Sequence, residues 1–231
     1  MSDKIIDKFE FYDVLGSLVP GLVAIGMIFG AWWWTGHRLQ IPSMPQGVPV
    51  LVILATAIVV GQVIQALGSL VEPFYYWTWG GRPSDRALKA KGKQTSSAQA
   101  ERLRKRLANY IGADTSRPLT DQEVFLGALS LCTHKTLGRV QRFNSLYAYH
   151  RALTTLLLIS TIMTLAIIFF VEPNPPAAWP IVLCELVATL LLWFRTKQRA
   201  SYYVDEVLRM ADLELGFLYQ RVNLSQPVST S

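Results

Sequence analysis

The order of apolar and polar residues divides the chain into four long hydrophobic stretches separated by polar segments. The stretches cover residues 14–34, 48–71, 153–171 and 177–194. An α-helix rises about 1.5 Å per residue, so about 20 predominantly apolar residues cross the hydrocarbon core of a bilayer. None of the four stretches contains Lys or Arg, and Glu185 is the only acid in any of them. The pattern predicts an all-α, polytopic membrane protein with four transmembrane helices.

Three polar segments complete the predicted domain organisation. Residues 1–13 have apolar side chains at positions 5, 6, 9 and 12 with charges between them, which is typical of a short interfacial helix. Residues 72–152 are long enough for a small domain, and residues 195–231 follow the fourth stretch as a C-terminal tail. We expect the 72–152 segment to form a helical loop domain, because it has no strand pattern.

Two helices are predicted inside this loop. In "AERLRKRLANYIG" one helical face is apolar, and Gly112 is placed where a helix would end. The residues of that face are Leu103, Leu107, Tyr110 and Ile111. Thr120 to Glu123 has the form of a capping box and should begin a second helix. Its apolar face holds Val124, Phe125, Ala128, Leu129 and Cys132. From about Arg139, the chain is predicted to continue as one helix into the third stretch.

Composition supports a membrane protein over a soluble one. Of 231 residues, 51% are hydrophobic and only 16% are charged, which departs from an ordinary soluble domain. The alternative is a soluble core with four buried helices, but the remaining polar chain is too short to enclose them. The two cysteines, Cys132 and Cys184, do not make a disulfide framework, and they suit a reducing cytoplasm.

The distribution of positive charge predicts the orientation. The 72–152 segment has fourteen Lys and Arg residues, whereas the short connections 35–47 and 172–176 have only Arg38 between them. Lys and Arg are retained on the cytoplasmic side of a membrane. We therefore expect both termini and the loop domain to be cytoplasmic, and the chain to lie in a bacterial inner membrane in contact with lipid.

Small and polar residues mark a packing face on each stretch. Small residues allow membrane helices to approach closely, and Gln, Ser and Thr can form hydrogen bonds across the contact. The predicted helix-packing glycines are Gly26 and Gly30, which have GxxxG spacing, and Gly61 and Gly68 on the second stretch. The predicted membrane-embedded polar groups are Gln62, Gln65, Thr161, Thr164 and Glu185.

Glu185 is the main candidate for chemistry. Counted from the outer ends of the helices, it lies roughly 12 Å deep and Thr164 roughly 11 Å, whereas Gln62 lies roughly 21 Å deep. Thr164 and Thr161 are therefore expected to be better partners than either glutamine. A charged carboxylate at this depth costs about 2.5 to 3.5 kcal/mol. Three interpretations remain: a neutral Glu that joins helices or subunits, a residue that lines an aqueous path or senses protons, and a side chain that faces lipid.

The sequence has no motif that indicates an enzyme. The sequence contains no GxSxG, HExxH, Walker or GxGxxG pattern. We expect no enzymatic activity, no cofactor and no metal. A basic set in the loop would attract lipid headgroups or an acidic partner, and direct nucleic-acid binding is the less favoured interpretation. The set comprises Lys89, Lys91, Lys93, Arg102, Arg104, Lys105 and Arg106.

Two short stretches carry a resemblance. "FYDVLGSLVPGLVAI", entering the first span, and "RFNSLYAYHRAL", entering the third, resemble small four-span membrane proteins of bacterial antiviral-defence operons. Such proteins include the membrane subunit of the Kiwa system and four-span effectors of cyclic-nucleotide signalling systems. The resemblance implies a homo-oligomeric inner-membrane component that senses infection or perturbs the membrane. The chain lacks a recognisable nucleotide-sensing domain, so a trigger would act through the helical loop or a partner protein.

Three classes of function remain open. The favoured one is a non-enzymatic four-span oligomer that acts as a membrane sensor or effector with a cytoplasmic protein partner. The second is an ion channel or transporter that uses Glu185, although the two pairs of spans show no inverted repeat. The third is a membrane anchor or assembly scaffold in which every polar residue serves packing.

Overall fold

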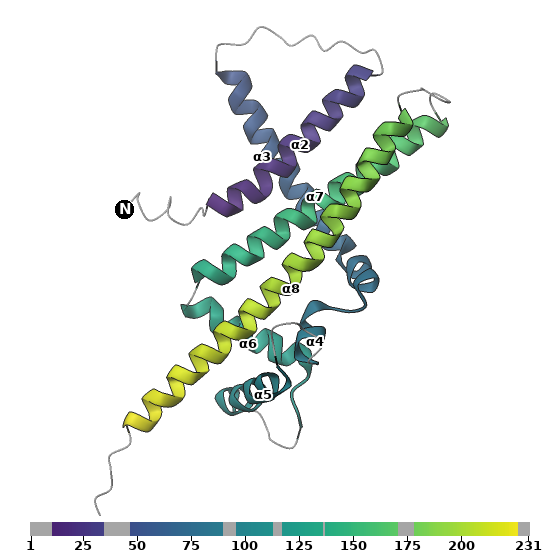
Figure 1. The fold of residues 1–231 in the computed structure, drawn as a ribbon. Coiled ribbons are helices and arrows are strands. Elements are labelled where there is room, and N and C mark those ends of the chain that lie inside the picture. The colour runs from purple at the N-terminus through teal and green to yellow at the C-terminus, as the bar shows by residue number, and fades with distance from the viewer. Residues whose placement is uncertain are drawn as a thin grey trace, which may run out of the picture. The chain divides into compact units, whose positions relative to one another are not determined.

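The computed structural model is all-α over the residues it describes, namely 11–34, 47–89, 96–112, 117–135, 137–170 and 178–225. Four helices in these ranges are long and apolar enough to cross a membrane (Figure 1). They are α2 (Phe11–Trp34), α3 (Val48–Trp79), α7 (Leu137–Phe170) and α8 (Ala178–Ser225). The shorter helices are α4 (Pro83–Leu88), α5 (Ser97–Ile111) and α6 (Asp121–Lys135). The predicted fold class is confirmed, and the interfacial helix predicted at residues 1–13 falls largely outside the described residues.

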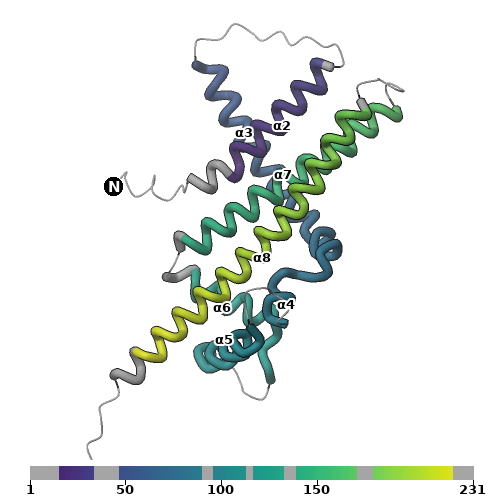
Figure 2. Tube along the Cα trace, in the orientation of Figure 1, coloured from purple at the N-terminus to yellow at the C-terminus, as the bar shows by residue number. Residues whose placement is uncertain are grey.

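Three of the long helices continue beyond the apolar stretches that predicted them. The trace in Figure 2 shows each of them as one unbroken helix. α3 runs to Trp79 and is followed by Gly80 and Gly81, whose φ angles of 78° and 114° suit glycine and not a helix. α7 begins at Leu137, which confirms the predicted helix into the third stretch. α8 has 48 residues, so most of the segment predicted as a tail is helical.

The chain divides into two compact units that share these helices. The membrane unit comprises Met1–Phe74 and Ser145–Lys197, and the helical domain comprises Tyr75–Asn144 and Gln198–Ser231. α3, α7 and α8 each pass from one unit into the other within a continuous helix. The loop predicted to form a domain is therefore only part of it, because the C-terminal half of α8 belongs to the same unit.

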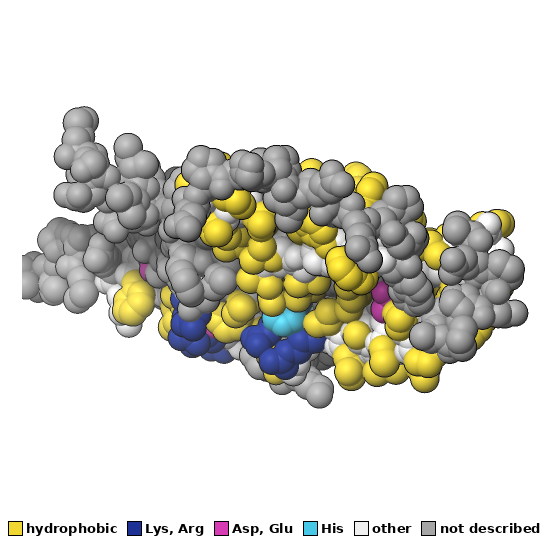
Figure 3. All heavy atoms as spheres, turned by 90° about the horizontal axis from the view of Figure 1, so that it is seen from above, with side chains coloured by type: hydrophobic (Ala, Val, Ile, Leu, Met, Phe, Trp, Pro, Cys, Tyr) yellow, Lys and Arg dark blue, Asp and Glu magenta, His cyan; other side chains and the backbone are white. Residues whose placement is uncertain are grey.

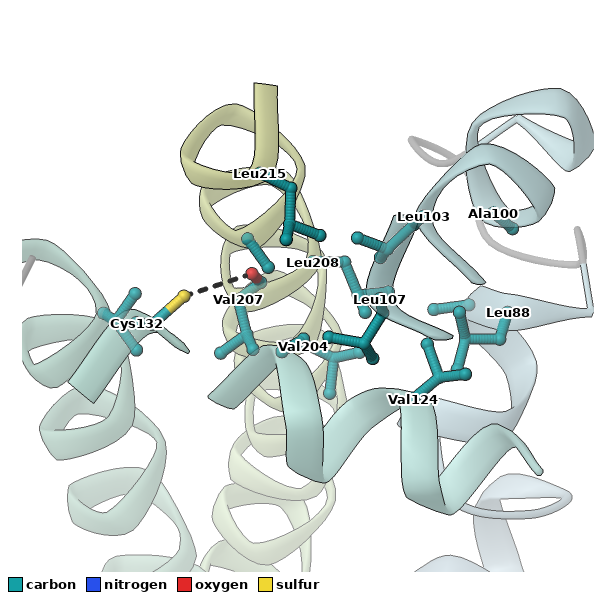
Figure 4. Close-up of a cluster of buried hydrophobic side chains, with 14 residues drawn as sticks. Leu88, Ala100, Leu103, Leu107, Val124, Cys132, Val204, Val207, Leu208 and Leu215 are labelled. Atoms are coloured by element: carbon teal, nitrogen blue, oxygen red, sulfur yellow. Dashed lines mark hydrogen bonds between the residues drawn. The ribbon is translucent and has the colours of Figure 1, made fainter. Parts of the chain in front are cut away.

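The helical domain has its own apolar core, drawn in Figure 4. α8 contributes one buried stripe to this core at the spacing of a helix face. The stripe consists of Val204, Val207, Leu208, Ala211 and Leu215. On α5, Leu103 and Leu107 are buried as predicted, whereas Tyr110 and Ile111 are about half exposed, so the predicted face was too wide at its C-terminal end. On α6, Val124, Ala128 and Cys132 are buried, which confirms that face.

Local capping contacts fix the ends of the domain helices. The backbone N–H of Thr120 donates to Glu123 Oε2 at 2.7 Å, and the N–H of Glu123 donates to Thr120 Oγ1 at 3.2 Å. This reciprocal pair is the predicted capping box, which is confirmed. Gly112 ends α5 with a φ of 63°, a left-handed conformation that glycine adopts without steric cost.

The membrane unit exposes much of its apolar surface. Apolar side chains make up most of the described surface in the view of Figure 3. In this unit the apolar side chains of Leu51, Leu70, Phe170 and Leu191 are each at least 65% exposed. A soluble protein rarely exposes contiguous apolar surface on this scale. Lipid is the environment in which such helices are stable, so the exposed surface agrees with a membrane protein.

Candidate functional site: polar groups on the long apolar helices

Glu185 makes a short hydrogen bond between two long helices. The hydroxyl of Ser160 on α7 donates to Glu185 Oε1 on α8 at 2.6 Å. The prediction of Thr161 and Thr164 as its partners was wrong. It assumed that the C-terminal end of the third span and the N-terminal end of the fourth lie at the same depth, and an offset of about one turn moves the contact from Thr164 to Ser160. Thr161 instead donates to the carbonyl of Leu157 in its own helix.

Two buried oxygens beside this bond have no hydrogen-bond partner. Within the described part of the chain, neither Glu185 Oε2 nor Thr189 Oγ1 forms a hydrogen bond, although each is enclosed by protein atoms. The two residues are four positions apart on α8 and so share one face. Most buried polar atoms in folded proteins are paired. The turn from Glu185 to Thr189 is therefore unusual, because it holds two buried oxygens that have no hydrogen-bond partner among the described residues.

The two glutamines belong to a different contact, between α2 and α3. Gln62 Nε2 donates to Ser17 Oγ at 2.6 Å, and Gln65 Nε2 reaches the same oxygen at 3.3 Å. Both residues were predicted as membrane-embedded polar groups, and the structure brings them to one serine. They lie apart from the pair formed by Ser160 and Glu185, so the polar groups form more than one site.

Glycine allows α2 and α3 to meet backbone to backbone at this contact. A Cβ atom on Gly61 would lie 1.8 Å from the carbonyl oxygen of Ser17, and one on Gly21 would lie 1.7 Å from that of Ala57. Both contacts are too short for any side chain. Gly61 is thus a packing residue, as predicted. Gly68 is another, because its Cβ would lie 3.3 Å from Thr155 Oγ1 on α7.

The GxxxG pair of α2 does not make a helix contact within the described chain. A Cβ atom on Gly26 or Gly30 would meet nothing within 4 Å. The predicted packing role of these two glycines is therefore not seen within the described part of one chain, and it stays a prediction. The physical reason is the position of the crossing: α2 approaches α3 around Ser17 and Gly21, more than one turn before Gly26.

A charged cluster joins α3 and α7 at the end of the membrane unit. Arg151 Nη1 donates to Glu72 Oε1 at 2.9 Å, and Arg151 Nη2 donates to Ser69 Oγ at 2.9 Å. The Tyr147 hydroxyl donates to the same Glu72 oxygen, and its ring lies 5.3 Å from the guanidinium carbon. The arginine side chain is only 13% exposed. These charges are held inside the protein and compensate each other.

Sequence reasoning missed this cluster because its members lie at the boundaries of the predicted spans. Glu72 was assigned to the start of the loop, and Arg151 was counted only for orientation. A usable signal was present, since Tyr147 and Arg151 are four residues apart on one helix face. Nothing in the sequence, however, pairs that face with Glu72, which is 79 residues from Arg151.

Two further hydroxyls join α7 and α8. The Thr154 and Thr196 hydroxyls lie 2.8 Å apart, and each also donates to the carbonyl four residues earlier in its own helix. Each hydroxyl has only one hydrogen. The threonine that donates to the other threonine therefore shares this hydrogen with the carbonyl in its own helix. Both threonines are at most 1% exposed. The pair ties the helices together and offers no surface to a ligand.

Two arginines of the predicted basic patch form ion pairs inside the helical domain. Arg104 pairs with Asp121 and also donates to the Leu119 carbonyl, which holds α5 to α6. Arg106 pairs with Asp212 at 2.9 Å, which holds α5 to α8. Both arginines stay partly exposed, and their predicted contact with lipid or a partner stays a prediction.

The remaining members of the patch are exposed or undescribed. Lys89 and Arg102 are exposed, and Lys105 forms a surface pair with Glu101 at 3.1 Å. Lys91 and Lys93 lie outside the described residues. The positive surface that the structure leaves available is thus smaller than the sequence predicted.

Cys132 is the buried thiol of the helical domain. Burial raises the pKa of Cys132 to about 11, with a further contribution from Glu214 and Glu206. Its sulfur donates to the Val207 carbonyl at 3.5 Å (Figure 4). The thiolate is the nucleophilic form of cysteine, so this side chain is a core residue and not a reagent at neutral pH. The described residues also contain no cluster of three potential metal ligands.

Comparison of the chain with protein-family models, with curated proteins and with solved structures finds no match. The polar contacts of the long helices and the core of the helical domain are therefore the basis for the functional proposal.

Proposed function

We propose that this chain is a non-enzymatic, homo-oligomeric protein of the bacterial inner membrane that acts as a sensor or membrane-perturbing effector in antiviral defence. In this proposal both termini and the helical domain are cytoplasmic, and the domain docks a cytoplasmic protein partner. The proposal unites the four apolar helices, the charge distribution and the resemblance carried by "FYDVLGSLVPGLVAI" and "RFNSLYAYHRAL".

The continuity of α8 supports this proposal most directly. One helix of 48 residues carries Glu185 in the membrane unit and the buried stripe around Val207 in the helical domain. A partner that binds the helical domain and shifts its part of α8 also acts on the part of α8 in the membrane unit, because the helix is continuous. An anchor needs only one span to hold a domain at the membrane, whereas three shared helices suit a protein that changes the membrane unit in response to its domain.

The experiment is phage challenge of bacteria that express the full chain together with its neighbouring genes, with plaque counts and a membrane-potential dye as readouts. We expect fewer plaques than in cells without the chain, and depolarisation only after infection. Val207→Asn, at a position 0% exposed, should abolish both effects. Leu213→Asn on the same helix is the matched control at a position 48% exposed, and it should retain them. Full plaque counts and unchanged potential with the wild-type chain, across a broad phage panel, would refute the defence role.

The orientation is tested separately with an introduced cysteine. Lys89→Cys places a thiol at an exposed site of the helical domain, in a background in which Cys184 is replaced by alanine. A membrane-impermeant maleimide should label this thiol in broken cells and leave it unlabelled in intact ones. Labelling of intact cells would overturn the cytoplasmic assignment and the cytoplasmic partner with it.

An ion channel or transporter is the second candidate, because Glu185 has a buried oxygen without a hydrogen-bond partner among the described residues. Proteoliposome flux separates it from the first candidate. A channel should conduct without a cytoplasmic partner, and Glu185→Gln should change that flux. Equal silence of the wild type and the variant would leave the sensor, or an anchor or scaffold, as the function.

A further inference from the structure

Two described glutamates of the membrane unit, Glu72 and Glu185, lie in opposite environments. Glu72 has a guanidinium and a phenol as donors, from Arg151 and Tyr147. Glu185 has one neutral donor, the hydroxyl of Ser160. Compensation by a cation allows a buried carboxylate to stay ionised, whereas a single hydroxyl compensates little of the lost hydration.

In the described apolar parts of α7 and α8, no cation replaces the arginine that Glu72 has. Residues 153–170 of α7 and 178–194 of α8 contain no Lys, Arg, His or Asp, and the only other titratable side chain there is Cys184. Cys184 is exposed. An ionised Glu185 in a bilayer would therefore lose its hydration without gaining a compensating charge. The neutral acid avoids that cost by binding one proton.

The two oxygens of Glu185 have different roles in the neutral acid. Oε1 accepts the Ser160 hydroxyl at 2.6 Å, as the carbonyl oxygen of an acid does. The proton then belongs on Oε2, the buried oxygen without a partner among the described residues. One turn along α8, the Thr189 hydroxyl is also buried and unpaired there. Thr189 shares a helix face with Glu185, but the two side chains form no hydrogen bond with each other.

We propose that Glu185 and Ser160 form a proton-binding site, in which Glu185 is held as the neutral carboxylic acid. Binding adds one proton to Oε2, and release returns it and leaves a carboxylate whose Oε1 keeps the Ser160 hydroxyl as its donor. Ser160 is the positioning residue of the site, because its hydroxyl holds Glu185 Oε1. The site requires that α8 lies in the bilayer, and it does not depend on a role in defence.

The test uses the full chain in liposomes near neutral pH, with infrared spectroscopy and mass spectrometry as readouts. We expect a carboxylic-acid C=O band that disappears in Glu185→Gln, a variant that keeps the size of the side chain and an oxygen for Ser160. Ser160→Ala should shift this band to higher wavenumber, because the C=O loses its donor. Thr161→Ala is the matched control: its hydroxyl is buried one residue away but bonds to Leu157, so the band should not move.

Dicyclohexylcarbodiimide, which modifies protonated carboxyl groups in apolar surroundings, gives an independent readout. Peptide mapping should find the adduct on Glu185, and Glu72→Gln should leave its yield unchanged because Glu72 is paired with Arg151. Retention of the C=O band in a folded Glu185→Gln variant, or an adduct on Glu72 in place of Glu185, would overturn the proposal. Folding of each variant is checked by its retention in the membrane fraction and by its helical circular dichroism.

Discussion

Replacing Gly61 with alanine perturbs the closest helix contact in the membrane unit. The new Cβ would lie 1.8 Å from the Ser17 carbonyl oxygen, whereas ordinary van der Waals contact begins at 3.4 Å. The opposing atom is backbone, so no rotamer change relieves the clash. The two helices must separate by about 1.6 Å at this point, which is the difference between those two distances.

Three terms set the size of the effect. Overpacking costs about 1 to 3 kcal/mol. Separation also breaks the Gln62 and Gln65 hydrogen bonds to Ser17, which are 2.6 and 3.3 Å long, and such bonds in membranes average about 0.6 kcal/mol each. Alanine returns about 1 kcal/mol through its higher helix propensity. The net loss of stability is therefore about 1 to 3 kcal/mol.

Gly26→Ala is the matched control, because a Cβ at Gly26 meets nothing within 4 Å. It adds the same methyl group to the same type of helix, and we expect its unfolding free energy to stay unchanged or to rise by up to about 1 kcal/mol. The assay is reversible unfolding in mixed detergent micelles, followed by tryptophan fluorescence. The reasoning is refuted if both variants shift the unfolding free energy equally, or if Gly61→Ala does not lower it.

Three further predictions follow from other contacts. In a double-mutant cycle of Glu72→Gln and Arg151→Gln, the coupling free energy in the same assay should be about 1.5 to 3 kcal/mol, since the bond joins two charged, mostly buried groups. The pKa of Glu123 is lowered, first by the Thr120 backbone N–H and then by its hydroxyl, so the capping box stabilises the domain above the ordinary pKa of a glutamate and loses this contribution as pH falls through the lowered value. Thr120→Ala should therefore move the Glu123 pKa upward in an NMR titration. The raised pKa of Cys132 stabilises the fold at low pH, and that contribution should be lost as pH rises from 9.0 to about 11, measured as a falling unfolding temperature of the wild type relative to Cys132→Ala.

Each of these predictions has its own control. The exposed pair of Glu101 and Lys105, with side chains 67% and 75% exposed, should show coupling of only about 0.3 to 0.5 kcal/mol. Equal coupling in the two cycles would mean that the cluster at Glu72 is open to solvent. An unchanged Glu123 titration in Thr120→Ala would exclude the hydroxyl as a cause. For Cys132, parallel pH profiles of the wild type and the alanine variant would show that the thiol does not titrate in this range.

The sequence predicted local features well where the physical cause is itself local. Thr120 and Glu123 form the capping box because both partners lie within one helical turn, and Gly112 ends α5 because its left-handed conformation suits glycine. It predicted distant pairs poorly. Gly26 and Gly30 have the spacing of a packing motif, but a Cβ on either would meet no other helix in the described chain. Gly21 is not part of a GxxxG motif, yet it lies against Ala57.

The sequence by itself determined that the chain forms four long apolar helices, because hydrophobic length and the absence of charge are properties of consecutive residues. Only the tertiary structure decided which polar groups meet: Ser160 with Glu185, Ser17 with both glutamines, and Arg151 with Glu72. The rotation and axial offset of each helix select these partners. Those two quantities depend on side-chain packing between segments far apart in the chain, and an offset of one turn or a rotation of one residue changes the partner without changing the hydrophobic pattern.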